Sequence, residues 1–333
     1  MQIYNVKEGK HQKSLLSQKY GATNAIFSHA PGCIIHSSTK INRKAILCHF
    51  LLKPSLATKY VCSQNLSDTI RYLSTHDNSY IRYFEGHTQN VTCLSLHPGQ
   101  DNFLSCSEDN TLRVWDAASK NSCGKLLLNG AYLAAWDPSG SVFAVASPTA
   151  ASILLYDFRN YNKPPFATFD MLPHAHEMGR SISKGWNKLE FSNDGKHILL
   201  GTNGTSHFLL DAFDGHLKAT LSRPSSGSRR LGAGDHNPEN MDPLNPDYVF
   251  PSSGDACFTP DGRYVVSGSR GQNCLVWDTL AVPSAEETGK RVNPVHELEY
   301  RGESACIAFN PRYNFFATGD QDVVFWVPDP SLV

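Results

Sequence analysis

Five residues in one stretch of the chain could be interpreted as a catalytic Ser/His/Asp set and its surroundings: His87, Asp109 and Trp115, with Ser105 or Ser107 as the serine. A serine, a histidine and an aspartate can form a nucleophilic triad, in which the histidine takes the serine proton and the aspartate orients the histidine. The same types can instead form a buried hydrogen-bond network, because a histidine can bridge a carboxylate and a hydroxyl while an indole N–H donates to that hydroxyl. The sequence around these residues distinguishes the two interpretations.

The five residues lie inside the clearest copy of an internal repeat. This copy begins at Gly86-His87, contains apolar runs at 91–96 and 103–107, and ends at Leu112–Asp116. A repeat of roughly 40 to 45 residues with a GH start and a WD end is typical of a four-stranded propeller blade. In such a blade the five residues form a structural network, and we expect removal of Asp109 to destabilise it by roughly 1 to 3 kcal/mol, because buried donors lose their acceptor.

Weaker copies of the repeat keep a degenerate form of the same third-strand ending. The endings lie at Arg71–Ser74, Leu154–Asp157, Leu209–Asp211, Val276–Asp278 and Phe325–Val327. Four of the copies have a turn that favours a hairpin between their first two strands, at Asp137–Gly140, Ser192–Gly195, Thr259–Gly262 and Asn310–Tyr313. The sequence therefore predicts an all-β WD40 β-propeller, as a single domain over residues 1–330.

Three segments depart from this regular pattern. Residues 1–5 match another third-strand ending, so we predict that 1–20 is the remnant of a first blade; alternatively, His11–Ser17 closes a six-bladed ring. Residues 42–66 interrupt the next repeat with apolar sequence that has little loop punctuation, and we interpret them as an aberrant insertion, a retained intron or a gene-model error. Residues 222–253 are rich in proline and poor in apolar residues, which predicts a long flexible loop.

The bulk composition argues against several classes of function. The formal charge of -1 gives no electrostatic reason for direct binding to nucleic acid. The nine cysteines are scattered singly without a CxxC pair, which favours a reducing compartment and predicts neither a metal site nor a cofactor. The most apolar run, Ala45–Leu52, is far shorter than the roughly 20 residues that cross a bilayer, so we expect no membrane segment.

More specific strings resemble one family, the WD-repeat subunit shared by the COMPASS histone H3 lysine methyltransferase complex and the nuclear cleavage and polyadenylation machinery, the Swd2 type. They are Lys19–Gly21, Ile26–Ala30, Asp68–Ser74, His76–Asn78, Tyr80–His87, Pro165–Phe169, Trp186–Lys196 and Asp211–Phe213. The resemblance implies a seven-bladed propeller whose first blade is truncated in this chain. It also implies a nuclear, non-catalytic scaffold of the histone H3 lysine-4 methyltransferase complex that binds the catalytic subunit and other COMPASS subunits.

The same resemblance implies a link to mRNA 3′-end processing and transcription termination. Its partners there are cleavage and polyadenylation or phosphatase factors, with an indirect link to the phosphorylated tail of RNA polymerase II. Residues just before first strands, or in turns between second and third strands, line the propeller face where peptides dock. By this rule the candidate protein-binding residues are Asn110, Tyr132, Trp186, Asn203, Arg270 and Glu303.

Two other classes of function are considered. Tyr156–Arg159 weakly matches the WDxR motif of substrate receptors of cullin-type ubiquitin ligases, whereas the best blade ends in Trp115–Ala118 and lacks the arginine. A propeller hydrolase needs clustered carboxylates or a metal site, and the sequence has neither at suitable spacing. The scaffold is therefore the preferred prediction, and the ligase receptor is the alternative.

Overall fold

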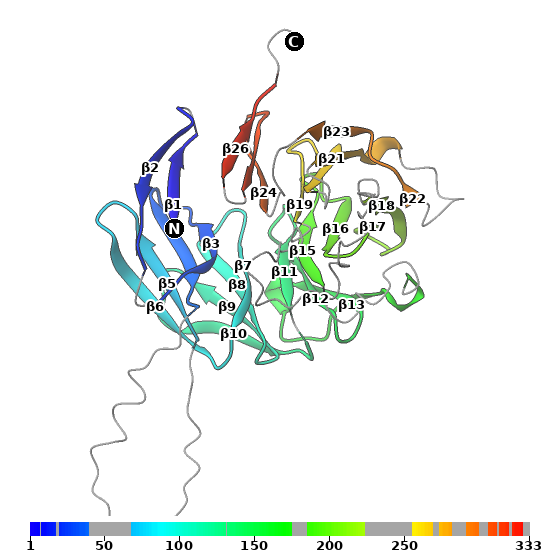
Figure 1. Cartoon of the computed structure of the whole chain (residues 1–333). Helices are drawn as coiled ribbons and strands as arrows, with labels where there is room; N and C mark the ends of the chain where they lie inside the picture. Colours follow the sequence, from blue (N-terminus) through cyan, green and yellow to red (C-terminus); the bar gives the residue numbers. More distant parts are fainter. Residues whose placement is uncertain are drawn as a thin grey trace, which may run out of the picture. The chain divides into compact units, whose positions relative to one another are not determined.

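The computed structural model describes residues 1–6, 8–17, 20–39, 68–130, 132–174, 185–223, 255–268, 273–281, 291–299, 306–311, 313–319 and 322–328. These residues form β-strands joined by turns and three single turns of 3-10 helix (Phe158–Asn160, Leu172–His174 and Thr279–Ala281) (Figure 1). In this part of the chain no helix has the length and hydropathy needed to cross a membrane. The chain divides into two compact units, Met1–Thr168 and Phe169–Val333.

The first unit begins with a two-stranded sheet, β1 (Gln2–Asn5) and β2 (Lys10–Ser14). Antiparallel sheets of four strands in chain order follow. The first contains β3 (Thr23–Phe27), β4 (Cys33–Ser37), β5 (Asp68–Ser74) and β6 (Ser79–His87), and the second β7 (Val91–Leu96), β8 (Asn102–Ser107), β9 (Thr111–Asp116) and β10 (Ser122–Leu127). The third contains β11 (Leu133–Trp136), β12 (Val142–Ser147), β13 (Ser152–Asp157) and β14 (Ala167–Asp170), and the division between the units falls within β14.

The second unit repeats this arrangement with additions and omissions. Its first sheet contains β15 (Trp186–Phe191), β16 (His197–Thr202), β17 (Ser206–Asp211) and β18 (Leu217–Ser222), to which the short β22 (Arg291–Val292) adds in parallel. The next contains β19 (Ala256–Phe258), β20 (Tyr264–Gly268), β21 (Asn273–Asp278) and β23 (His296–Glu299). The last described sheet has β24 (Cys306–Phe309), β25 (Phe316–Gly319) and β26 (Val323–Trp326).

This strand order confirms the predicted all-β propeller fold. The predicted endings at residues 74, 116, 157, 211 and 278 are the last residues of the third strands β5, β9, β13, β17 and β21. The β1–β2 sheet fits the prediction of a truncated first blade, and β2 spans part of the segment proposed as an alternative closing strand. Residues 42–66 and most of 222–253 lie outside the described residues, and the single domain over 1–330 stays a prediction.

A β-bulge near the start of a blade's first strand changes which side chains face the core. The pairing register shifts between Val91 and Cys93 in β7, and between Trp186 and Lys188 in β15. Because one extra residue reverses the alternation of side chains, the residue before the bulge shares a face with the residue three positions later. Trp186 therefore faces the core together with Leu189, and both are buried.

Aromatic side chains pack neighbouring sheets of the first unit together. Phe84 of β6 packs edge-on against Phe103 of β8 and Trp115 of β9, with ring centroids 5.0 and 5.5 Å apart. Ile35, Ile70 and other apolar residues complete this cluster, which is almost fully shielded from water. The packing fixes the end of β6 against β8 and β9, and so positions the residues at that end.

Gly215 is expected to be required in the turn between β17 and β18. Its φ is +74°, and a Cβ atom there would lie 2.2 Å from the Phe169 ring. We expect Gly215→Ala to destabilise the second unit by about 2 kcal/mol, because it combines backbone strain with a steric clash. Gly262→Ala is the matched control, since Gly262 has a φ of +71° but its Cβ would meet no atom closer than 3.7 Å. Equal losses in urea unfolding would contradict the proposed clash.

Candidate functional site

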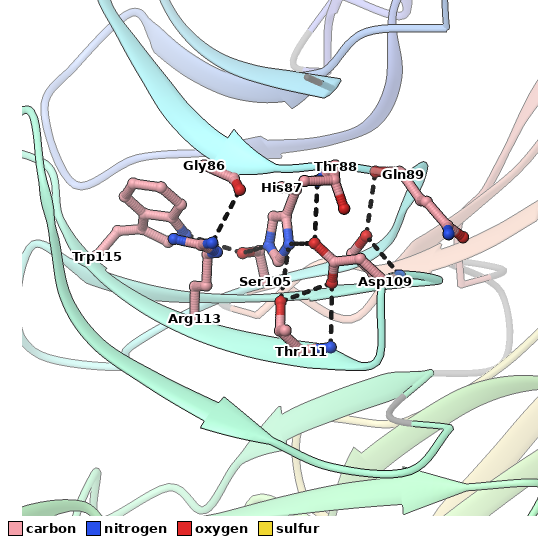
Figure 2. A network of polar contacts seen from close by, with 10 residues as sticks. Gly86, His87, Thr88, Gln89, Ser105, Asp109, Thr111, Arg113 and Trp115 are labelled. Atoms are coloured by element: carbon pink, nitrogen blue, oxygen red, sulfur yellow. Dashed lines mark hydrogen bonds and ion pairs between the residues drawn. The ribbon is translucent and has the colours of Figure 1, made fainter. Parts of the chain in front are cut away.

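The network predicted around His87 is assembled from three strands and one turn. His87 is the last residue of β6, Ser105 lies within β8, and Trp115 lies near the end of β9. Asp109 lies in the turn between β8 and β9, where Asn110 has a left-handed φ of 59° that asparagine tolerates better than most residues. Figure 2 shows the imidazole of His87 between the carboxylate of Asp109 and the hydroxyl of Ser105.

The three side chains at the centre of this network form a continuous relay. His87 Nδ1 lies 3.0 Å from Asp109 Oδ2, and His87 Nε2 lies 2.6 Å from Ser105 Oγ. Because a carboxylate only accepts, Nδ1 carries the proton and donates to Asp109. In neutral His87, Nε2 then accepts from the hydroxyl of Ser105. Ser105 Oγ in turn accepts from the indole N–H of Trp115 at 2.8 Å, so its hydroxyl is engaged on both sides.

Asp109 also accepts hydrogen bonds from Thr88 and Thr111. The backbone N–H of Thr88 donates to Oδ2 at 3.0 Å, while the hydroxyl and N–H of Thr111 donate to Oδ1 at 2.6 and 3.0 Å. Burial favours the neutral acid, but the hydrogen bonds from His87, Thr111 and Thr88 outweigh it and hold the pKa of Asp109 below its ordinary value. Asp109 is therefore an ionised carboxylate with very little exposure.

Sequence reasoning missed part of this arrangement. Ser107, which it grouped with Ser105, is outside the relay and instead donates to the Gln89 carbonyl at 3.0 Å. Arg113 donates to the Gly86 carbonyl at 2.8 Å, and a Cβ at Gly86 would lie only 2.5 Å from that guanidinium. The glycine of the GH pair could have indicated this contact from the sequence, because a glycine often stands where another part of the chain approaches the backbone closely.

The structure describes four of the six predicted protein-binding residues. Asn110, Tyr132 and Asn203 are exposed, with Tyr132 at 40% of its full exposure. Trp186 is wrong as a binding residue, because the bulge in β15 turns it into the core, where its exposure is 1%. Arg270 and Glu303 lie outside the described residues.

Comparison with known proteins identifies the family. The model of the WD domain, G-beta repeat, matches residues 78–116 and 253–278. WD repeat-containing protein 82 of Drosophila melanogaster is 35% identical over 326 residues, which cover 98% of this chain and 83% of that protein. COMPASS component SWD2 of Saccharomyces cerevisiae is 32% identical over 334 residues, which cover 99% and 84%. The chain belongs to the Swd2 type of WD-repeat proteins. Set1 complex component swd2 of Schizosaccharomyces pombe is also similar, at 28% identity over 357 residues that cover 98% of this chain and 86% of that protein.

The second unit of this Swd2-type chain contains a modified version of the relay. Ser267 and Trp277 occupy the places in β20 and β21 that Ser105 and Trp115 occupy in β8 and β9. His207 of β17 lies with Nε2 2.8 Å from Ser267 Oγ, while its Nδ1 accepts from the Thr202 N–H at 3.1 Å. The imidazole is therefore neutral with its proton on Nε2, and burial, with a further contribution from the positive charge of Arg223, holds its pKa well below the ordinary value.

Arg223 directly follows the last residue of β18, and its guanidinium donates to backbone carbonyls of other strands and turns. It donates to the Gly268 carbonyl through Nε and Nη2 at 3.2 and 2.8 Å, and through Nη1 to the carbonyls of Thr202 and Gly204 at 3.3 and 3.0 Å. Arg223 and His207 are both buried. In the second unit Arg223 and His207 thus link the sheet that begins with β15 to the sheet that begins with β19. In the first unit the His87–Asp109 pair links β6 to the turn between β8 and β9.

Ser105 of the Swd2-type chain is expected not to react with a fluorophosphonate probe for nucleophilic serines. Its side chain has 0% exposure, and its hydroxyl is engaged by His87 and Trp115, so an electrophile cannot approach it. Incubation of the native protein with the probe, followed by peptide mass spectrometry, is expected to give no adduct. Stoichiometric labelling of Ser105 that is lost in His87→Ala would show instead that the triad acts as a nucleophile.

Proposed function

We propose that this chain is a non-catalytic scaffold subunit of a Set1/COMPASS-type histone H3 lysine-4 methyltransferase complex in the nucleus. The observation that carries the proposal is the similarity, over nearly the whole chain, to proteins named COMPASS component SWD2 and Set1 complex component swd2. The burial of His87 and Ser105, and the small exposure of the Asp109 side chain, support a structural use of these residues. In this proposal the chain presents binding surfaces, and the catalytic subunit performs the methyl transfer.

The proposed partners fall into two assemblies. In the first, the chain binds the methyltransferase catalytic subunit and other COMPASS subunits. In the second, it binds cleavage and polyadenylation or phosphatase factors and takes part in mRNA 3′-end processing, with an indirect connection to the phosphorylated tail of RNA polymerase II. No direct contact with nucleic acid is proposed, since the net charge of -1 provides no general attraction to phosphate backbones.

Affinity purification of the tagged full chain from nuclear extract tests both assemblies. We expect mass spectrometry to recover the methyltransferase subunit together with other COMPASS subunits, and polyadenylation or phosphatase factors as a separable pool. Depletion of the chain is expected to lower histone H3 lysine-4 methylation. Recovery of a cullin adaptor without any methyltransferase subunit would overturn the proposal in favour of a ubiquitin-ligase receptor.

A further inference from the structure

Two histidines connect three consecutive turns of the first unit, each of which joins the first and second strands of its sheet. The turns lie between β3 and β4, between β7 and β8, and between β11 and β12. His29 of the first turn donates through Nε2 to the His97 carbonyl of the second turn at 2.8 Å. The ring of His97 continues the series, with Nε2 3.1 Å from the Gly140 carbonyl of the third turn. Two imidazoles thereby join three sheets.

The hydrogen bonds of His97 determine its charge and its tautomer. Nδ1 accepts from the Gly99 N–H at 3.0 Å, so Nδ1 carries no proton. The proton of the ring is therefore on Nε2, which donates to the Gly140 carbonyl. A proton added to Nδ1 would point at the Gly99 N–H and place one donor against another. Both contacts of the ring together thus require a neutral imidazole.

The surroundings of His97 disfavour a positive charge. The ring is buried, and its centroid lies 4.6 Å from that of Trp136 in β11 and 5.7 Å from that of Phe158 in the following turn of 3-10 helix. Burial lowers the pKa of His97 below its ordinary 6.5 and outweighs the hydrogen bond to Gly140, which raises it. The charge of His29 lowers this pKa further.

The acidic residues of the adjoining turns do not compensate a charge on His97. Asp137, in the third turn, accepts from the N–H and the hydroxyl of Ser139. Asp101, in the same turn as His97, is exposed, and neither carboxylate is bonded to the imidazole. The titratable group whose charge acts on His97 is His29. His29 can keep its own hydrogen bond in either charge state, because its Nε2 carries a proton in both.

We propose that His97 is a proton-controlled latch of the first unit: the neutral imidazole holds the second and third turns together, and protonation releases them. The proposal is independent of the proposed function, because it concerns contacts within one unit of the chain. Since the closed latch disfavours the added proton, closure is complete above pH 6.5 and is lost progressively below that value. Release of the ring also uncovers Trp136, whose exposure in the closed state is 8%.

The second unit contains a similar link that does not titrate. Asn193, in the turn between β15 and β16, donates through Nδ2 to the Pro260 carbonyl at 2.9 Å, in the turn between β19 and β20. A side-chain amide keeps its donor as the pH changes, whereas an imidazole gains a charge near neutral pH. The link from Asn193 to Pro260 is therefore an internal control for the latch.

Hydrogen exchange of the full chain, followed by mass spectrometry, tests the latch between about pH 7.5 and about pH 5.5, with correction for the intrinsic exchange rates. In wild type, the peptides with His97 and Gly140 are expected to lose protection by a few-fold, up to about tenfold, and those with Asn193 and Pro260 to keep it. His97→Gln should show no such loss, because an amide donates without titrating. His76→Gln removes an exposed histidine and should behave as wild type. Equal loss in wild type and His97→Gln, or no loss in wild type, would overturn the proposal.

A second variant tests the latch while keeping the imidazole. A Cβ at Gly140 would lie 2.5 Å from Cε1 and Nε2 of His97, so Gly140→Ala is expected to displace the ring. This variant should show the acid pattern of exchange already at about pH 7.5, with little further loss on acidification. Gly262→Ala is the matched control, because Gly262 lies in the corresponding turn of the second unit with the same φ of +71° and more space for a Cβ. An acid response of wild-type size in Gly140→Ala would contradict the latch.

Discussion

Replacing Asp109 by alanine is expected to lower the free energy of unfolding of the first unit by about 3 kcal/mol. The substitution removes the acceptor of four hydrogen bonds, from His87, Thr88 and both donors of Thr111. His87 and Thr111 are buried, so water cannot replace the lost acceptor without opening the structure. Urea unfolding, with hydrogen exchange of the β8 and β9 amides, measures the loss and its location. Asp77→Ala is the control at an exposed turn, where Asp77 accepts from the exposed hydroxyl of Ser79, and little change is expected.

The Asp109 variant should also alter the response to acid. The folded-state pKa of Asp109 lies below its ordinary 3.8, so the unfolded chain takes up this proton first as the pH falls. The stabilisation is complete above that ordinary value and is lost progressively below it. We expect wild type to lose stability in this acid range more steeply than Asp109→Ala. Parallel curves for the two proteins would show that Asp109 does not carry the effect.

Replacing Arg223 by methionine is expected to destabilise the second unit by about 3 kcal/mol. Methionine keeps most of the apolar stem of arginine but removes the donors that satisfy the carbonyls of Thr202, Gly204 and Gly268. Buried carbonyls without a donor keep their desolvation penalty. Arg263→Met provides the comparison, because Arg263 is half exposed and its ion pair with Asp278 lies at the surface, and little change is expected. Losses of similar size in urea unfolding would contradict a special role for Arg223.

The pH dependence of the second unit should reveal the charge of His207. Its folded-state pKa lies well below the ordinary 6.5, through burial first and the charge of Arg223 second. The neutral imidazole therefore stabilises the fold above pH 6.5, and this contribution is lost as the pH falls below that value. Unfolding measured from about pH 8 to pH 5 should show the loss in wild type and a weaker dependence in Arg223→Met, where the neighbouring charge is absent. A steeper loss of stability on acidification in Arg223→Met than in wild type would refute the effect of the Arg223 charge on the pKa of His207.

The sequence by itself determined the strand pattern and its chemistry in the best blade. The third-strand endings at Asp116, Asp157, Asp211 and Asp278 were predictable, because alternation of apolar residues and the turn residues between strands are local properties of the chain. The association of His87, Asp109 and Ser105 was predictable as well, since one repeat contains all three. Because the copies of the repeat share a sequence pattern, the strand arrangement inferred for one copy also applies to the others.

Only the tertiary structure decided the positions that depend on register and on distant neighbours. A single extra residue in β15 buries Trp186, which sequence position alone placed on the binding face. His207 and Ser267 are 60 positions apart, and Arg223 reaches a carbonyl 45 positions away, so no local pattern marks either contact. The physical reason is that bulges and sheet packing choose the neighbours of a side chain, whereas local sequence chooses only its strand or turn.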